Sequence, residues 1–141
     1  MSQVKETATV GVALIGSGRM GAYHGATLAQ RLPGARLAAV ADPAPGAAEK
    51  LAAVLGAGAA YTDPAQAFAD PAVDAVVIAA PARFHADLIV TAAGAGKAVF
   101  CEKPAALKWY SRLPVRKAPP GRASIFTSCS PARAGEQYES R

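Results

Sequence analysis

The chain has 141 residues, of which 52% are hydrophobic, a length that provides one domain with a buried core but not two full domains. Its formal net charge of +5 lies entirely in residues 108–141, because residues 1–107 hold eight basic and eight acidic side chains, so we expect no nucleic-acid partner for the folded part. Two cysteines, Cys101 and Cys129, exclude a disulfide framework and a cysteine metal site.

The first apolar run, VGVALI at 10–15, is too short for a signal-peptide core or a membrane span, so we expect a cytoplasmic protein that does not bind membranes. Apolar runs and helical patterns alternate from there onward. They predict strands at 10–15, 35–42, 58–62, 74–81 and 97–102, and helices at 20–32, 44–55, 64–70 and 84–95. Strands that alternate with helices imply right-handed crossovers and a parallel sheet. We therefore predict a doubly wound α/β domain of the Rossmann type, with about five strands, over residues 1–107.

A glycine-rich turn, GSGRMG, joins the first predicted strand to the first predicted helix. Its first glycine permits a tight turn, the second lets the backbone approach a pyrophosphate, and the third lets helix and strand pack closely. The amide groups at the start of the helix and the positive end of its dipole suit a diphosphate. The cofactor-binding residues predicted here are Gly16, Ser17, Gly18, Arg19, Met20 and Gly21, with Arg19 at the rim.

An acidic residue, Asp42, closes the second predicted strand 21 residues after Gly21, at the spacing of a ribose-binding carboxylate. Hydrogen bonds from ribose hydroxyls to a carboxylate contribute about 1.5–3 kcal/mol each. The 2′-phosphate of NADP would be repelled by the negative charge of this carboxylate. The next residues, Pro43 and Ala44, include no arginine that could bind the phosphate. The turn and the carboxylate together predict a dinucleotide site that prefers NAD to NADP. The alternative is that Asp42 only caps the helix at 44–55.

Three segments in order, GSGRMGAYHGATLA, AAVADP and AAPARFHADLIVTAAGAGKAVFCEKP, resemble the N-terminal domain of the Gfo/Idh/MocA oxidoreductases, with the inositol 2-dehydrogenases as the nearest branch. The resemblance extends from residue 10 to about residue 107. It implies NAD-dependent dehydrogenation at a CH–OH group of a polyol or sugar of the inositol type.

The resemblance also implies roles for residues near the second half of the sheet. Lys103 of the EKP motif would contact substrate and nicotinamide, and Glu102 would shape the turn beside it and the cofactor. Ala80 and Pro81 would lie under the nicotinamide, and His85 matches a motif histidine at the next helix.

From the residues alone, alternatives remain for the charged and polar members of this set. Lys103 follows a predicted parallel strand, where a lysine can hold an alcohol oxygen and stabilise negative charge, or can simply be solvated. His85 either contacts the cofactor or hydrogen-bonds nearby backbone. The resemblance is imperfect at two positions, since many members of the family have serine or threonine where this chain has Ala80, and often asparagine where it has Ala82. No metal site is predicted.

The character of the sequence changes after Leu107, where charge becomes basic, serine becomes frequent and the apolar period is lost. Three explanations are open for residues 108–141: a changed reading frame, a disordered tail on a purposeful module, or a nucleic-acid-binding tail. We favour the first, and note that residues 122–128 could add a weak edge strand.

The resemblance implies a substrate domain that carries a general-base histidine, and we expect this domain to be absent here. The chain alone should therefore be inactive, and it should not form the oligomers of the family. The rival class of function is a non-catalytic dinucleotide-binding fragment or module.

Overall fold

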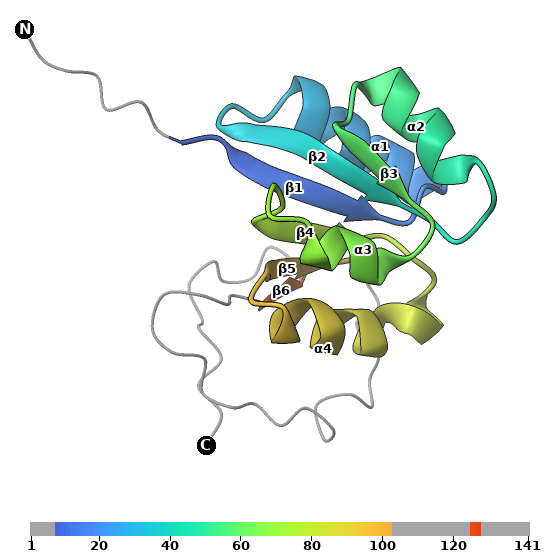
Figure 1. Cartoon of the computed structure of the whole chain (residues 1–141), viewed down its shortest axis with the longest axis vertical. Helices are drawn as coiled ribbons and strands as arrows, with labels where there is room; N and C mark the ends of the chain where they lie inside the picture. The colour runs from blue at the N-terminus through green and yellow to red at the C-terminus, as the bar shows by residue number, and fades with distance from the viewer. Residues whose placement is uncertain (1–7, 103–124, 128–141) are drawn as a thin grey trace, which may run out of the picture.

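A computed structural model describes residues 8–102 and 125–127 (Figure 1). A parallel sheet forms its middle layer, and helices cover both faces. Helices α1 and α2 pack on one face, and α3 and α4 pack on the other. The α/β fold class predicted from the alternating pattern is confirmed.

All six strands of the sheet run parallel, in the order β3-β2-β1-β4-β5-β6. The strands are β1 (Val10–Ile15), β2 (Ala35–Ala41), β3 (Ala59–Tyr61), β4 (Ala75–Ile78), β5 (Ala98–Cys101) and β6 (Ile125–Thr127). The sheet grows in one direction from β1 to β3 and in the other from β4 onward, so the direction reverses between β1 and β4. In open sheets of this kind, ligands bind at that reversal, beside the carboxyl ends of the strands. Strand β6 lies within 122–128, where the sequence allows a weak edge strand, and raises the count from about five to six.

The helices are α1 (Arg19–Gln30), α2 (Ala47–Leu55), α3 (Pro64–Ala69) and α4 (His85–Gly94), and a 3₁₀ turn at Ala82–Phe84 precedes α4. Helix α2 begins three residues later than predicted, because Gly46 at its N-cap adopts the left-handed conformation, with φ of 74°. Helix α3 begins where the sequence predicts, since Pro64 needs no amide hydrogen there and the Asp63 side chain accepts from Ala65 N at 2.9 Å.

Small side chains bring α1 close to the sheet. A Cβ atom added at Gly25 would lie 2.7 Å from Leu55 Cδ1 and 3.1 Å from Leu14 Cδ2. A separate buried apolar cluster lies on the opposite face of the sheet, and it includes Val76, Ile78 and Ile89. Both faces of the central strands are therefore buried, as continuous apolar runs predict.

Cys101 lies at the end of β5 with 0% of its surface exposed. Burial, with a smaller contribution from the charge of Glu102, raises the pKa of its thiol to about 11. Since the thiolate is the reactive form, we expect Cys101 to react with iodoacetamide at pH 8 at least roughly 100-fold more slowly than an exposed thiol. Mass spectrometry of the Cys101 peptide measures the rate of alkylation. Glutathione serves as the reference thiol, and a sample in denaturant gives the rate for the exposed cysteine. Equal rates in the native and denatured samples would show that β5 is not buried.

Candidate functional site

Most of the predicted site residues meet at one edge of the sheet, at the carboxyl ends of four adjacent strands. The glycine-rich turn follows β1, and Asp42 follows β2. The Ala80–Pro81 segment follows β4, and Glu102 follows β5. Because the strands are parallel and in register, these segments lie side by side across the reversal between β1 and β4.

The glycine-rich turn has the geometry that its three glycines predict. Gly16 has φ of 99°, and its N–H donates to Ala41 O at 2.8 Å. A Cβ atom at Gly16 would lie 2.8 Å from backbone atoms of Ala79 and Ala80, so the turn packs against the end of β4. A Cβ atom at Gly21 would lie 2.0 Å from Gly16 O. The turn can close this tightly only without side chains at these two positions.

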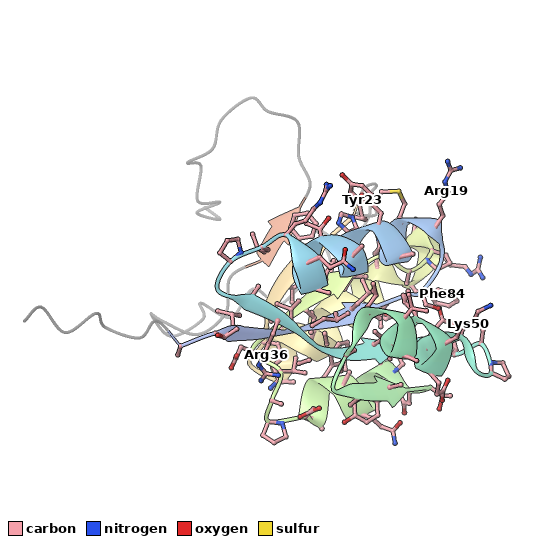
Figure 2. The ribbon with its side chains drawn as sticks, turned by 90° about the horizontal axis from the view of Figure 1, so that it is seen from above. Arg19, Tyr23, Arg36, Lys50 and Phe84 are labelled. Atoms are coloured by element: carbon pink, nitrogen blue, oxygen red, sulfur yellow. The ribbon has the colours of Figure 1, made fainter. Side chains whose placement is uncertain are left out.

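The second glycine differs from the other two. Gly18 is the N-cap of α1, is exposed, and has extended backbone with φ of −70°. Apart from its two chain neighbours, no described residue lies within 4 Å of a Cβ built there. The first turn of α1 contains no acidic side chain, and the amides of a first helical turn have no acceptor within the helix. Arg19 and Met20 are exposed beside it, and Arg19 projects from the start of α1 away from the body of the molecule (Figure 2). The surface at Gly18 is therefore open and rich in hydrogen-bond donors.

The Asp42 carboxylate faces this turn and is held by three hydrogen bonds. Its Oδ2 accepts from Ser17 N at 2.8 Å and from Ser17 Oγ at 2.7 Å, and its Oδ1 accepts from Ala44 N at 2.8 Å. Partial burial alone would raise the pKa of the Asp42 carboxyl, but the bonds from the Ser17 hydroxyl and the two amides outweigh burial and lower it. The carboxylate is therefore ionised at neutral pH. The alternative of a helix cap is wrong, because Gly46 is the N-cap of α2.

His85 is the buried polar residue of this edge, with 1% of its surface exposed. Its Nε2 donates to Ala80 O at 2.6 Å, and Phe84 N donates to Pro81 O at 2.9 Å. These bonds fix the turn after β4, as the backbone-binding alternative for His85 predicts. A direct contact between His85 and a cofactor stays a prediction.

Glu102 makes a contact that the sequence analysis did not predict. Its Oε1 forms an ion pair or short hydrogen bond with Nε2 of His24, on α1, and its N–H donates to Ile78 O at 2.9 Å. The His24 ring also lies edge-on to Phe100, with 6.1 Å between ring centroids. The pair links the helix that begins at the glycine-rich turn to the end of β5. Lys103, the next residue, lies outside the described residues.

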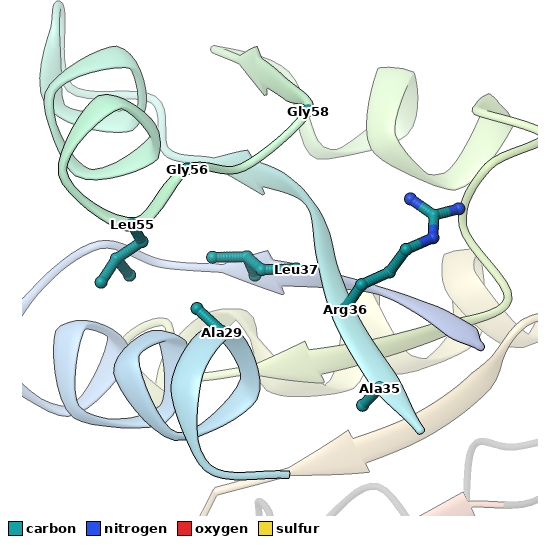
Figure 3. A pocket seen from close by; sticks show the side chains of 7 residues that line it. All are labelled: Ala29, Ala35, Arg36, Leu37, Leu55, Gly56 and Gly58. Atoms are coloured by element: carbon teal, nitrogen blue, oxygen red, sulfur yellow. The ribbon is translucent and has the colours of Figure 1, made fainter. Parts of the chain in front are cut away.

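A cavity of about 300 Å³ lies at the opposite edge of the sheet (Figure 3). It is lined by Ala29, Ala35, Arg36, Leu37, Leu55, Gly56 and Gly58, where α1 and α2 end and β2 begins. Arg36 points away from Leu55, and its Nη2 donates to Ala72 O at 3.0 Å. The cavity is separate from the residues at the carboxyl edge.

Two further properties concern the described part of the chain. Within residues 8–102 and 125–127, His, Cys, Asp and Glu side chains form no group of three suited to a metal ion. No helix in those ranges is long and apolar enough to cross a membrane.

Comparison with known protein families identifies the family of this chain from a region that contains both the sheet and the glycine-rich turn. The model of the Gfo/Idh/MocA oxidoreductases, described as an oxidoreductase family with an NAD-binding Rossmann fold, matches residues 10–112. The chain belongs to this family. The predicted resemblance is confirmed, and the glycine-rich turn and Asp42 occupy an NAD-binding Rossmann domain of the Gfo/Idh/MocA type.

Curated members of the family share the same region. The chain is 44% identical over 95 residues to the scyllo-inositol 2-dehydrogenase (NAD(+)) of Bacillus subtilis, which covers 67% of this chain and 28% of that protein. It is 48% identical over 96 residues to the inositol 2-dehydrogenase of Rhizobium meliloti, and this match covers 68% of this chain and 28% of that protein. The chain thus spans less than a third of the length of these relatives and corresponds to their N-terminal part.

Solved structures show the same correspondence. The scyllo-inositol dehydrogenase of Lactobacillus casei with bound NAD(H) and scyllo-inositol superposes with a TM-score of 0.67 and 32% identity, over 70% of this chain and 29% of that one. The myo-inositol dehydrogenase of the same organism, in complex with NAD(H) and myo-inositol, gives a TM-score of 0.66 and 34% identity. NAD is therefore the cofactor of the family to which this domain belongs.

Proposed function

We propose that this domain binds NAD at the carboxyl edge of its sheet, as the N-terminal part of an oxidoreductase acting on a CH–OH group of an inositol-like polyol or sugar. One observation carries the proposal: the Asp42 carboxylate is fixed toward the glycine-rich turn, so that a ribose acceptor and a diphosphate surface are adjacent. The inositol dehydrogenases with bound NAD(H) support the choice of cofactor and substrate class.

The diphosphate would lie over the turn at Gly18, where the backbone is open. Amide groups at the start of α1 would donate to the phosphate oxygens, and the helix dipole adds a favourable field. Gly16 and Gly21 allow the turn to close, while Met20 and Arg19 border the site. Arg19 is exposed, and its charge would be screened by solvent.

The nicotinamide half of the cofactor would lie along the ends of β4 and β5. Ala80 and Pro81 would support the ring from the turn that His85 fixes, so His85 would act mainly through the Ala80 carbonyl. Glu102 would hold the end of β5 against α1 through His24. Lys103, which follows it, would hold the substrate's alcohol oxygen. NAD supplies the hydride acceptor for the reaction.

A second candidate is a dinucleotide-binding module without catalysis. Among the described residues, His85 is buried and donates to Ala80 O, so it offers no open general base, and this favours the second candidate. A cytoplasmic location and the absence of nucleic-acid, membrane and oligomeric partners stay predictions under either candidate. The two candidates share the same cofactor site and differ only in turnover.

Cofactor preference tests the shared site. We expect NADH to bind more tightly than NADPH, because a 2′-phosphate would meet the ionised Asp42 carboxylate. Asp42→Ala should weaken NADH binding by roughly 10- to 150-fold, which corresponds to the loss of one charged hydrogen bond of about 1.5–3 kcal/mol. The same change should leave NADPH binding less affected, so that the difference narrows. Fluorescence titration with both dinucleotides measures the two constants.

Asp87→Asn is the matched control, because it removes one exposed negative charge from α4, on the other face of the sheet. It should leave the ratio of the two binding constants unchanged. Tighter binding of NADPH than of NADH by the unmodified chain would sink the assignment of Asp42 to the ribose.

A further inference from the structure

The hydroxyl group of Ser17 is directed at Asp42. Its Oγ lies 2.7 Å from Asp42 Oδ2, and the Ser17 amide donates to the same oxygen at 2.8 Å. Ala44 N holds the other carboxylate oxygen. The Asp42 backbone is itself fixed, since Asp42 N donates to Tyr61 O on β3 at 3.0 Å. The carboxylate is thus held from both the glycine-rich turn and the loop after β2.

These bonds limit what the carboxylate can do with a ligand. An ionised carboxylate has about four acceptor positions, two on each oxygen. Ser17 fills two on Oδ2, and Ala44 fills one on Oδ1, which leaves a position on Oδ1 for a ribose hydroxyl. Rotation of the Asp42 side chain away from a 2′-phosphate would break the bonds to Ser17 and Ala44 together.

We propose that the Ser17 hydroxyl is a positioning group that sets cofactor specificity by holding the Asp42 carboxylate at the ribose end of the site. The role rests on the proposed function, because it presumes that a dinucleotide binds at this turn. Ser17 acts here through Asp42, and its hydroxyl does not contact the diphosphate. The backbone amide of Ser17 holds the same oxygen, so the side chain strengthens an orientation that the turn already favours.

Titration of four variants with NADH and NADPH tests this role: Ser17→Ala, Ser17→Thr, Asp42→Ala and the double variant Ser17→Ala/Asp42→Ala. Ser17→Ala should weaken NADH binding roughly 3- to 10-fold, less than Asp42→Ala does, because two amide donors remain. NADPH binding should weaken less or improve, so the preference for NADH over NADPH, expressed as the ratio of the two affinities, should fall. Ser17→Thr keeps a hydroxyl and should restore the ratio. In the Asp42→Ala background, Ser17→Ala should change neither constant.

Two binding results would overturn the proposal. Equal weakening of NADH and NADPH by Ser17→Ala, repeated in the Asp42→Ala background, would show a direct contact with the diphosphate. Tighter NADH binding by Ser17→Ala would show that the hydroxyl competes with the ribose for Oδ2.

The ligand-free protein provides a readout that is independent of NAD. The Ser17 hydroxyl lowers the pKa of Asp42, so Ser17→Ala should raise the carboxyl titration midpoint of Asp42 measured by NMR. An unchanged midpoint would overturn the positioning role whatever the binding data show. If the unmodified chain bound neither dinucleotide, the proposed function and the specificity role would fall together, while a raised midpoint would still establish the contact between Ser17 and Asp42.

Discussion

Gly18→Ala is expected to abolish most dinucleotide binding. It should change the free energy of unfolding by no more than about 1 kcal/mol from that of the unmodified chain, the usual scale for a change at a helix N-cap. The backbone at Gly18 is extended, with φ of −70°, so alanine can adopt it. Apart from its two chain neighbours, the added methyl group meets no described residue within 4 Å. It would instead occupy the open surface that a diphosphate must approach closely. Binding and stability should therefore separate at this position.

Gly21→Ala should weaken dinucleotide binding and also lower the free energy of unfolding. Its methyl group would lie 2.0 Å from Gly16 O, a backbone atom that cannot move without opening the turn. Gly16 is in turn packed against the backbone of Ala79 and Ala80, so the displacement would extend to the end of β4. Overpacking of this kind costs typically about 1–3 kcal/mol, and occasionally more.

Urea denaturation and NADH titration of both variants measure the two effects side by side. Gly94→Ala is the matched control, because Gly94 ends α4 at the opposite edge of the sheet and an added Cβ there meets nothing within 4 Å. It should leave NADH binding unchanged and should not lower the free energy of unfolding, because alanine is favoured over glycine at a helical position. NADH binding by Gly18→Ala at the unmodified level would mean that the diphosphate does not pass over this turn. Unmodified stability of Gly21→Ala would mean that the turn opens at little cost.

The order of strands and helices was predictable because it depends on local patterns. Continuous apolar runs such as 10–15 identify strands buried on both faces, and the alternation with helices implies parallel pairing. Boundaries were less accurate where backbone conformation decides. The predicted strand at 74–81 ends at Ile78 in the structure, because Ala80 and Pro81 belong to the turn that His85 holds.

The position of Asp42 was predictable from its spacing, but its environment was not. The bonds from Ser17 depend on how the glycine-rich turn folds back toward β2, which spacing alone does not specify. The contact between His24 and Glu102 joins residues 78 positions apart, and no local pattern marks such a pair. The local pattern around His24 places it on the first helix and does not indicate a partner at the end of β5.

The environments of the two histidines bear directly on catalysis. Hydride transfer from an alcohol needs a base that accepts the hydroxyl proton. The sequence contains two histidines. His24 contacts Glu102, and His85 is buried and donates to Ala80 O. The Nε2 atoms of both rings are thus engaged within the protein, so neither ring offers its Nε2 to an alcohol.

The 141-residue chain is accordingly expected to show no measurable NAD reduction with myo-inositol. Catalysis without a general base is slower by about 10²–10⁴-fold, and catalysis without substrate positioning forgoes up to roughly 7–11 kcal/mol in favourable cases. The measurement is NADH absorbance at high protein concentration, on a preparation whose NADH binding has been shown by titration, so that inactivity is not confused with misfolding. Turnover that disappears in Lys103→Ala would contradict the expectation, and would mean that Lys103 together with a base from elsewhere in the chain or from a second chain completes the site.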